Sequence, residues 1–127
     1  MDDRLAIELL DDDFTVCKVA DYSQTPLSLP FVFAARTDEE CSLVCPSPLV
    51  PSNATAVEAG WKAFRIVGTL DFSLIGIIAR ITTLLAERKI GVFIVSTFNT
   101  DYVLVRKDAM PAALSVLSEN GYEVRGQ

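Results

Sequence analysis

The sequence predicts a mixed α+β fold for residues 61–125, an antiparallel sheet with two helices on one face. Two observations support this prediction. The apolar residues change from the alternation of a strand to the three- and four-residue spacing of a helix, and then back again. Polar turns and helix-ending residues separate these segments from one another.

The first strand and the first helix follow directly on one another. Trp61–Val67 mixes β-branched and aromatic residues with spaced charges, which predicts a strand. Asp71 or Ser73 then caps a helix that runs from Phe72 to Arg88. Its apolar residues form one stripe: Leu74, Ile77, Ile78, Ile81, Leu84 and Leu85. This helix therefore has one face for a core.

A hairpin comes next. Val92–Thr97 and Tyr102–Arg106 are predicted strands, and the residues between them, from Phe98 to Asp101, form a tight polar turn. Because the connection is short, the two strands are expected to pair antiparallel.

A second helix and a last strand complete this half. Asp108 is the expected helix cap, with Pro111 in the first turn and Gly121 at the end. Tyr122–Arg125 alternates as a strand does. The order of strand, helix, strand, strand, helix and strand is that of the ferredoxin-like βαββαβ fold.

The first half is mostly β-structure. Four strands are predicted in two hairpins: Leu5–Leu10 with Phe14–Val19 around Asp11–Asp13, and Phe31–Arg36 with Cys41–Cys45 around Thr37–Glu40. Prolines after the second hairpin exclude a long helix there. Ser52–Thr55 is the best candidate for a linker.

A faint internal repeat relates the two halves. With an offset of 61 residues (104 minus 43), Phe31–Val50 aligns without gaps on Val92–Pro111. The first half then corresponds to a trimmed copy whose helices are replaced or reduced. The predicted division is a degenerate subdomain over residues 1–56 and a complete domain over residues 57–127.

Composition excludes several classes of function. The net charge is −6 and the eleven basic residues are scattered, so neither a nucleic acid nor an anionic membrane is an expected partner. The chain has no histidine, which excludes Ser–His and Cys–His nucleophile systems. Cys17, Cys41 and Cys45 lie in apolar runs and indicate reduced thiols in a cytoplasmic protein. No catalytic residue, metal site or cofactor is predicted.

One candidate binding segment is the loop between the first strand and helix. A helix amino terminus offers free N–H groups to a carboxylate. Gly76 falls within the predicted helix, where a glycine costs about 1 kcal/mol relative to alanine. A ligand or a backbone segment packed close to it would explain why a glycine is found there. Ordinary helix–sheet packing is the more common explanation for a single glycine. The segment comprises Asp71, Phe72, Ser73, Leu74, Ile75 and Gly76.

The hairpin turn is the second candidate segment. It comprises Ser96, Thr97, Phe98, Asn99, Thr100 and Asp101. Asp101 could pair with an ammonium group, while the hydroxyls and Asn99 orient a ligand. A solvated turn is the alternative, because these polar residues are common in turns. Phe98 fits that alternative less well.

Residues Gly91–Arg106 resemble the signature of a family of paired ACT domains. The family includes small prokaryotic proteins of ACT type and the eukaryotic cytosolic arginine sensors called CASTOR. Trp61–Ile66 and Gly76–Ala79 are also similar to that family, and the first half is similar more loosely. The resemblance covers Trp61 to Met110 best.

The resemblance implies a βαββαβ fold that binds an effector between ACT units. In the arginine sensors the ligand touches the elements that correspond to Asp71–Gly76, Phe98 and Asp101. The sensors have an acidic residue where this chain has Leu74, so a neutral amino acid fits here as well as arginine. Since the chain is half as long as those sensors, a homodimer would restore their four units.

Three functions follow from the sequence. The first is an amino-acid-binding regulatory protein without catalytic activity. In this function, Asp101 binds the α-ammonium group of the amino acid, and the backbone amides of Ser73–Gly76 bind its α-carboxylate. The second is a ligand-free interaction module whose sheet edge pairs with a protein partner. The third is the detached regulatory subunit of an amino-acid biosynthetic enzyme such as aspartate kinase.

Overall fold

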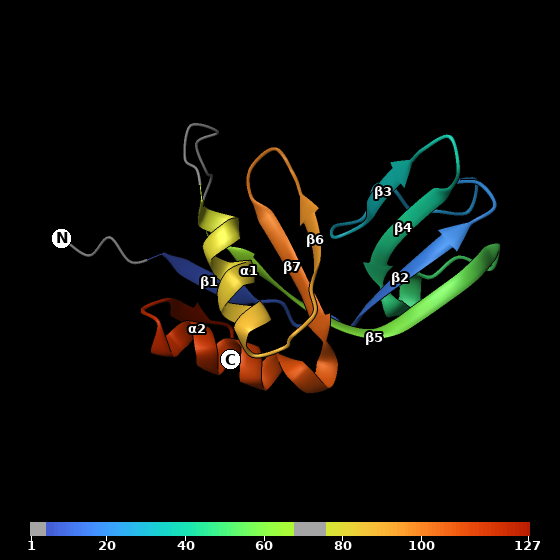
Figure 1. The fold of residues 1–127 in the computed structure, drawn as a ribbon. Helices are drawn as coiled ribbons and strands as arrows, with labels where there is room; N and C mark the ends of the chain where they lie inside the picture. Colours follow the sequence, from blue (N-terminus) through green and yellow to red (C-terminus); the bar gives the residue numbers. More distant parts are fainter. Residues whose placement is uncertain (1–4, 68–75) are drawn as a thin grey trace. The chain divides into compact units, whose positions relative to one another are not determined.

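The computed structural model describes residues 5–67 and 76–127. Its strands are β1 Ala6–Leu9, β2 Phe14–Val19, β3 Phe33–Arg36, β4 Cys41–Pro46, β5 Ala54–Ile66, β6 Phe93–Ser96, β7 Asp101–Arg106 and β8 Glu123–Arg125. Its helices are α1 Ile77–Glu87 and α2 Met110–Glu119, with short 3₁₀ helices η1 Ser47–Leu49 and η2 Lys107–Ala109. Figure 1 shows these elements along the chain.

The chain divides into two compact units. Unit 1 comprises Met1–Asp11 with Lys62–Gln127, and unit 2 comprises Asp12–Trp61. The strand β5 contributes residues to both. This division differs from the predicted boundary between residues 56 and 57, because β1 pairs within the sheet of unit 1 and β5 begins at Ala54. The origin of residues 1–56 as a degenerate copy stays a prediction.

Unit 1 has the ferredoxin-like α+β fold that the sequence predicts. The elements β5, α1, β6, β7, α2 and β8 follow in the expected order, and β6 and β7 form the predicted antiparallel hairpin. The sheet order is β8-β1-β5-β7-β6. Strand β1 therefore lies between β5 and β8, as a fifth strand added to the βαββαβ arrangement.

The predicted hairpin of the first two strands is wrong. Strand β1 pairs antiparallel with β5, where Ile7 lies opposite Ile66, and parallel with β8. Strand β2 pairs instead with β4 and with β5. The physical reason is burial: Ile7 is fully buried in the core of unit 1, and β1 supplies main-chain partners on both of its sides.

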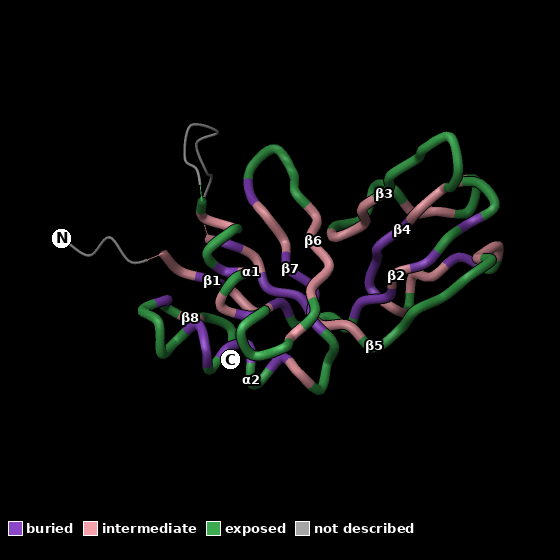
Figure 2. Tube along the Cα trace, viewed as in Figure 1, coloured by how far each residue is buried: buried purple, intermediate pink, exposed green. Residues whose placement is uncertain are grey.

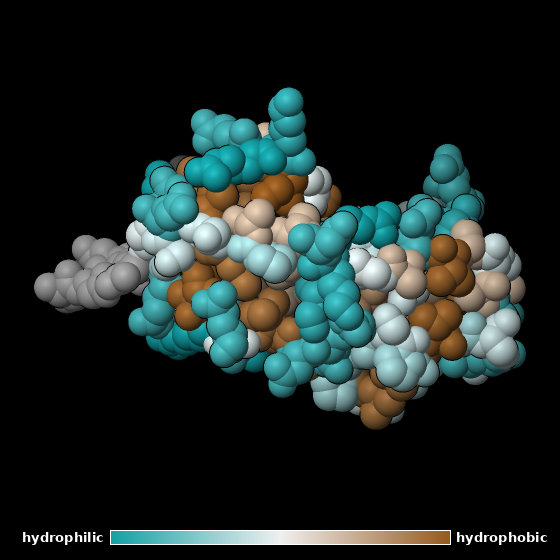
Figure 3. All heavy atoms as spheres, turned by 90° about the horizontal axis from the view of Figure 1, so that it is seen from below, coloured by the Kyte–Doolittle hydropathy of each residue, from teal (hydrophilic) through white to brown (hydrophobic). Residues whose placement is uncertain are grey.

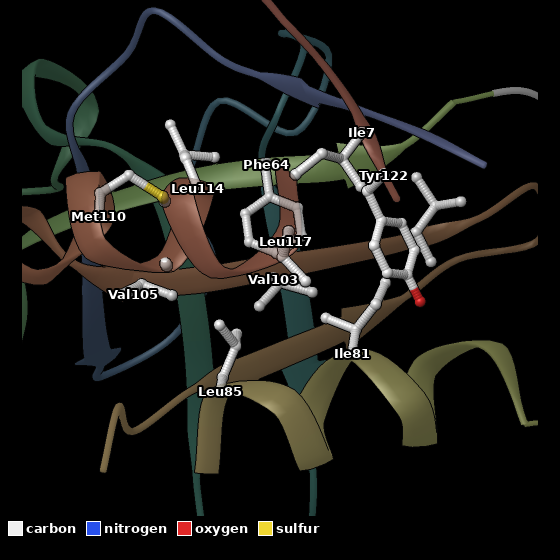
Figure 4. Close-up of a cluster of buried hydrophobic side chains, with 12 residues drawn as sticks. Ile7, Phe64, Ile81, Leu85, Val103, Val105, Met110, Leu114, Leu117 and Tyr122 are labelled. Atoms are coloured by element: carbon white, nitrogen blue, oxygen red, sulfur yellow. The ribbon is translucent and has the colours of Figure 1, made fainter. Parts of the chain in front are cut away.

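The core of unit 1 lies between the sheet and both helices (Figure 4). Its strands contribute Ile7, Phe64, Ile66, Val103 and Val105, while the helices contribute Ile81, Leu85, Met110, Ala113, Leu114 and Leu117. Because both helices bury their apolar stripes in this one cluster, they cover the same face of the sheet. The side chains between these strand positions point to the other face.

Both helices begin differently from the prediction. Helix α1 begins at Ile77, after Gly76, and the predicted caps Asp71 and Ser73 lie outside the described residues. Helix α2 begins at Met110, with Ala109 as its N-cap and no side-chain cap. The prediction of Asp108 as cap is wrong, because that residue lies within the 3₁₀ turn η2. Pro111 lies in the first turn of α2, as predicted.

Unit 2 is built from antiparallel strands in the order β3-β4-β2-β5. The predicted β3–β4 hairpin is confirmed. The predicted linker is wrong, since Ala54 already pairs with Val19 at the start of β5. A small core contains the buried residues Cys17, Val19, Leu43 and Cys45.

A pair of phenylalanine substitutions tests this account of the core. Phe64 is fully buried, whereas the side chain of Phe98 is 79% exposed. We expect Phe64→Ala to lower the free energy of unfolding by about 3–5 kcal/mol. Phe98→Ala should change it by about 0.5 kcal/mol or less. Urea denaturation measures both, and equal losses would contradict the assignment of Phe64 to the core.

The thiols of unit 2 predict a pH dependence of stability. Burial raises the pKa of Cys17, and it raises the pKa of Cys45 to about 11. The unfolded state then loses its Cys45 proton first, so the free energy of unfolding should fall as the pH rises from about 9 to 11. Chemical denaturation at several pH values measures this slope. Cys45→Ala should reduce it, and an unchanged slope would contradict the prediction.

Candidate functional site

The hairpin turn between β6 and β7 brings the second candidate segment together. Ser96 and Asp101 lie directly opposite each other in the last register pair. The Thr97 amide and the Thr97 hydroxyl both donate to the Thr100 carbonyl at 2.9 Å. The turn is therefore closed by hydrogen bonds between its own residues. For Thr97 and Thr100, this agrees with the alternative of an ordinary polar turn.

Asp101 and Ser96 form the polar end of the helix-covered face. Ile94 and Val103 lie two residues away on the same strands and contact the core. Because side chains alternate along a strand, Ser96 and Asp101 point to that same face. The Ser96 hydroxyl donates to Asp101 Oδ1 at 2.5 Å. Among the described residues no cation pairs with the Asp101 carboxylate, and the side chain is only partly buried.

A polar cavity lies on the other face of the same hairpin. Its volume is about 190 Å³, and it is lined by Glu8, Arg65, Ile66, Val67, Asn99, Thr100 and Tyr102. Arg65 donates from Nε to Glu8 Oε1 at 3.0 Å, and its Nη2 lies 2.9 Å from the same oxygen. Arg65 Nη1 lies 3.5 Å from the Tyr102 hydroxyl. The hydrogen bond to Tyr102 raises the pKa of the Arg65 guanidinium most, and the bond to Glu8 raises it further.

Glu8, Arg65 and Tyr102 were not among the site residues predicted from the sequence. Glu8 and Arg65 are separated by 57 positions and meet only because β1 pairs with β5. The alternation along β5 was the available signal: Arg65 stands between Phe64 and Ile66, and both neighbours face the core. A charged residue at that position must lie on the opposite face.

The remaining turn residues have separate roles. Thr100 is buried, and its hydroxyl donates to the Ile66 carbonyl at 2.9 Å, which ties the turn to β5. Asn99 is exposed and lines the polar cavity. Phe98 is 79% exposed at the tip of the hairpin, which Figure 2 shows as an exposed loop.

The first candidate segment is described only at its last residue. Asp71, Phe72, Ser73, Leu74 and Ile75 lie outside the described residues, so their meeting with the hairpin stays a prediction. Gly76 is the N-cap of α1 and has a φ of 83°.

Gly76 does not need a close neighbour to explain it. A Cβ added there would meet no described atom within 4 Å. The residue also lies at the helix terminus, outside the helix interior where a glycine is costly. Its left-handed conformation is the physical reason for the glycine, because other residues rarely adopt it. The contact of Gly76 with a ligand stays a prediction.

Within residues 5–67 and 76–127, no three histidine, cysteine or acidic side chains gather as a metal site would require. The cysteines of unit 2 are all free thiols. In the same residues no helix is both long and apolar enough to cross a membrane.

The arrangement at the hairpin suits recognition of small polar groups. The Asp101 carboxylate can accept from an ammonium group, and the partly exposed Arg65 and Tyr102 can bind a carboxylate or hydroxyl on the opposite face. The register of the paired strands determines which of these polar side chains lie on each face. The candidate site is therefore a hairpin with a different chemistry on each of its two faces.

Comparison with known proteins identifies the family. The ACT domain family matches residues 56–119, which is half of the chain, so this protein belongs to the ACT domain family. A solved structure of an Agobacterium tumefaciens protein is similar over 98% of this chain and 94% of its own, with 27% identity and a TM-score of 0.85. A Vibrio cholerae protein described as a possible transport protein is 24% identical, with a TM-score of 0.68 over 91% of this chain and 88% of its own.

Structures of aspartate kinases share the fold. The regulatory subunit from Thermus thermophilus is 10% identical, with a TM-score of 0.60 over 89% of this chain and 95% of its own. The Clostridium acetobutylicum aspartate kinase is 16% identical, with a TM-score of 0.64 over 91% of this chain. This chain spans 33% of that enzyme.

The bond between Thr100 and Ile66 gives a testable prediction. Thr100→Val keeps the shape but leaves the Ile66 carbonyl without this donor, so we expect a loss of about 1–2 kcal/mol in the free energy of unfolding. Thr83→Val, at an exposed position of α1, is the matched control and should be nearly neutral. Urea denaturation measures both, and equal effects would show that the bond does not fasten the turn.

Proposed function

We propose that this ACT protein is a non-catalytic regulatory protein that binds an amino acid at the β6–β7 hairpin. The observation that supports the proposal most directly is the Asp101 carboxylate. It lies at the end of the paired strands, partly exposed, with the Ser96 hydroxyl as its hydrogen-bond donor and no cation paired to it among the described residues. An α-ammonium group is the natural partner for such a carboxylate.

The ligand's carboxylate needs a second partner. On this face of the hairpin, the described contacts of Asp101 do not include a cation. In the proposal the amides of the loop from Asp71 to Gly76 supply that partner, together with an adjoining ACT unit of a second copy. The edge position of β6 and the exposed Phe98 are compatible with a homodimer that completes the site. The three free thiols fit a cytoplasmic protein.

A panel of amino acids tests the proposal by thermal shift. An amino acid at a hundredfold excess over its Kd should add about 2.7 kcal/mol to the free energy of unfolding and raise the Tm. Asp101→Asn should weaken binding by about tenfold or more, since it removes the charge that the ammonium group needs. Light scattering with and without the ligand reports whether the site is formed by a dimer.

Tyr102→Phe is the matched control for Asp101→Asn. Tyr102 is the next residue of β7, but it points to the opposite face of the sheet. Under the proposal this variant keeps the thermal shift. If Tyr102→Phe removes the shift and Asp101→Asn keeps it, the ligand binds on the face of Arg65. If no amino acid at millimolar concentration shifts the Tm, a ligand-free interaction module is the better description.

A second candidate function is the detached regulatory subunit of an aspartate kinase. The observation that favours it is the match in extent: the chain aligns with 95% of a whole regulatory subunit of that enzyme. Copurification of this protein with the catalytic chain of its own organism tests it. A kinase activity that responds to an amino acid only when this protein is present would support this function, and the absence of a complex would exclude it.

A further inference from the structure

The polar cavity at the hairpin lies on the face of the unit 1 sheet that the helices do not cover. Its lining residues are Glu8, Arg65, Ile66, Val67, Asn99, Thr100 and Tyr102. Apart from Ile66 and Val67, all of them carry polar side chains. Figure 3 looks toward α2, on the other side of the unit, and shows apolar side chains lying among hydrophilic ones there. The cavity therefore differs in character from the helix side.

Three neighbouring strands each supply one side chain to the cavity. Glu8 of β1 lies directly opposite Arg65 of β5 in the strand register. Arg65 donates from Nε to Glu8 Oε1 at 3.0 Å, and its Nη2 lies 2.9 Å from the same oxygen. Arg65 Nη1 lies 3.5 Å from the hydroxyl of Tyr102 on β7. The pairing of β1, β5 and β7 brings these groups together, so binding a ligand needs little rearrangement of the backbone.

The ion pair determines the charge of the ligand that can bind. The Glu8 carboxylate and the Arg65 guanidinium balance each other within the cavity. An anion would approach Glu8 as well as Arg65, and a cation would approach Arg65 as well as Glu8. Each attraction is therefore offset by a repulsion. The pairing favours a neutral ligand.

Two hydrogen-bonding groups of the lining can still take a further partner. Both contacts from Arg65 end on Glu8 Oε1, and no donor among residues 5–67 and 76–127 bonds to Oε2. The exposed side-chain amide of Asn99 makes no hydrogen bond to a described residue. Oε2 can accept a hydrogen bond, whereas the Asn99 amide can both donate and accept. A ligand that uses both groups therefore needs a donor next to a second polar group.

The size of the cavity limits the ligand. Its volume is about 190 Å³, which is below the range of about 300–1,000 Å³ for pockets that bind drug-sized molecules. Water occupies polar cavities of this kind, and a ligand that displaces it must replace its hydrogen bonds. Hydroxyl groups do so because each of them both donates and accepts. A small molecule with several hydroxyl groups therefore meets these requirements.

We propose that this cavity binds a small neutral polyol through two adjacent hydroxyl groups. One hydroxyl donates to Glu8 Oε2, and its neighbour bonds to the side-chain amide of Asn99. Arg65 keeps its contacts with Glu8 Oε1 and so positions the carboxylate. The site is separate from the proposed amino-acid site, because Asp101 points to the opposite face of the sheet.

Xylitol is a suitable probe for the experiment. It carries a hydroxyl group on every carbon atom, and it has neither the ammonium group nor the carboxylate of an amino acid. Its binding therefore does not depend on Asp101, and failure of one proposal leaves the other standing. A titration followed by amide chemical shifts gives both the Kd and the place of binding. We expect saturable shifts of the Asn99 side-chain amide and of the backbone amides of Val67 and Thr100.

Two variants decide whether the proposed groups bind the hydroxyls. Glu8→Gln replaces a charged acceptor with a neutral one and should weaken xylitol binding by about tenfold. Asn99→Ala should weaken it by about threefold to tenfold, and the change is at an exposed position that should keep the fold. Glu119→Gln is the matched control. It also removes the carboxylate of an ion pair, that of Glu119 with Arg88 on the helix side, and should leave the Kd unchanged.

Four outcomes would overturn the proposal. The compound 1,5-pentanediol, whose hydroxyls are not adjacent, should bind about tenfold more weakly than xylitol. Equal binding of the two would show that adjacent hydroxyls are not recognised. Tighter binding of propionamide would show a site for carboxamides instead. Equal weakening by Glu119→Gln would show that the loss at Glu8 is not specific to the cavity. Shifts confined to residues outside the cavity, or no saturable shifts, would show that the cavity does not bind polyols.

Discussion

The alternation of side chains along β5 is the constraint on which unit 1 depends. Phe64 and Ile66 are fully buried beneath both helices, and each contributes about 1.5–3 kcal/mol through burial. Arg65, between them, must then lie on the opposite face. A shift of one residue in the β1–β5 register would bring charge into the core, so this burial also fixes where Arg65 meets Glu8.

The same alternation gives the hairpin two chemical faces. Ile94 and Val103 bury one face of β6 and β7, which places Ser96 and Asp101 at the polar end of that face. Tyr102 then belongs to the cavity of Arg65. A run of residues that the sequence presents as one polar segment is thus divided in space. The register of the strands decides which of its side chains could act on one ligand.

Periodic segments were predictable from sequence, whereas long-range pairing was not. The apolar stripe of α1 and the alternating strands of the β6–β7 hairpin are periodic over neighbouring residues. The local sequence pattern is therefore enough to predict them. The position of β1 between β5 and β8 depends on partners far along the chain, and no local signal distinguishes it from a hairpin with β2. For the same reason Asp101 was found as a candidate while Glu8 was not. Gly76 was singled out from the sequence as well, and its positive φ gives a reason for the glycine that the sequence alone did not indicate.

An amino acid carries two charges, and this requirement connects the fold to the proposed interface. Asp101 can balance only the ammonium group, and the described groups that contact it do not include a cation. Arg65 is paired with Glu8 on the opposite face of the sheet, so it cannot approach the same ligand without crossing the strands. Under the proposed function, the ligand's carboxylate is therefore expected to meet groups of residues 71–76 or of another ACT unit. If the proposed site is only half complete in one unit, ligand binding and assembly of two units should stabilise each other.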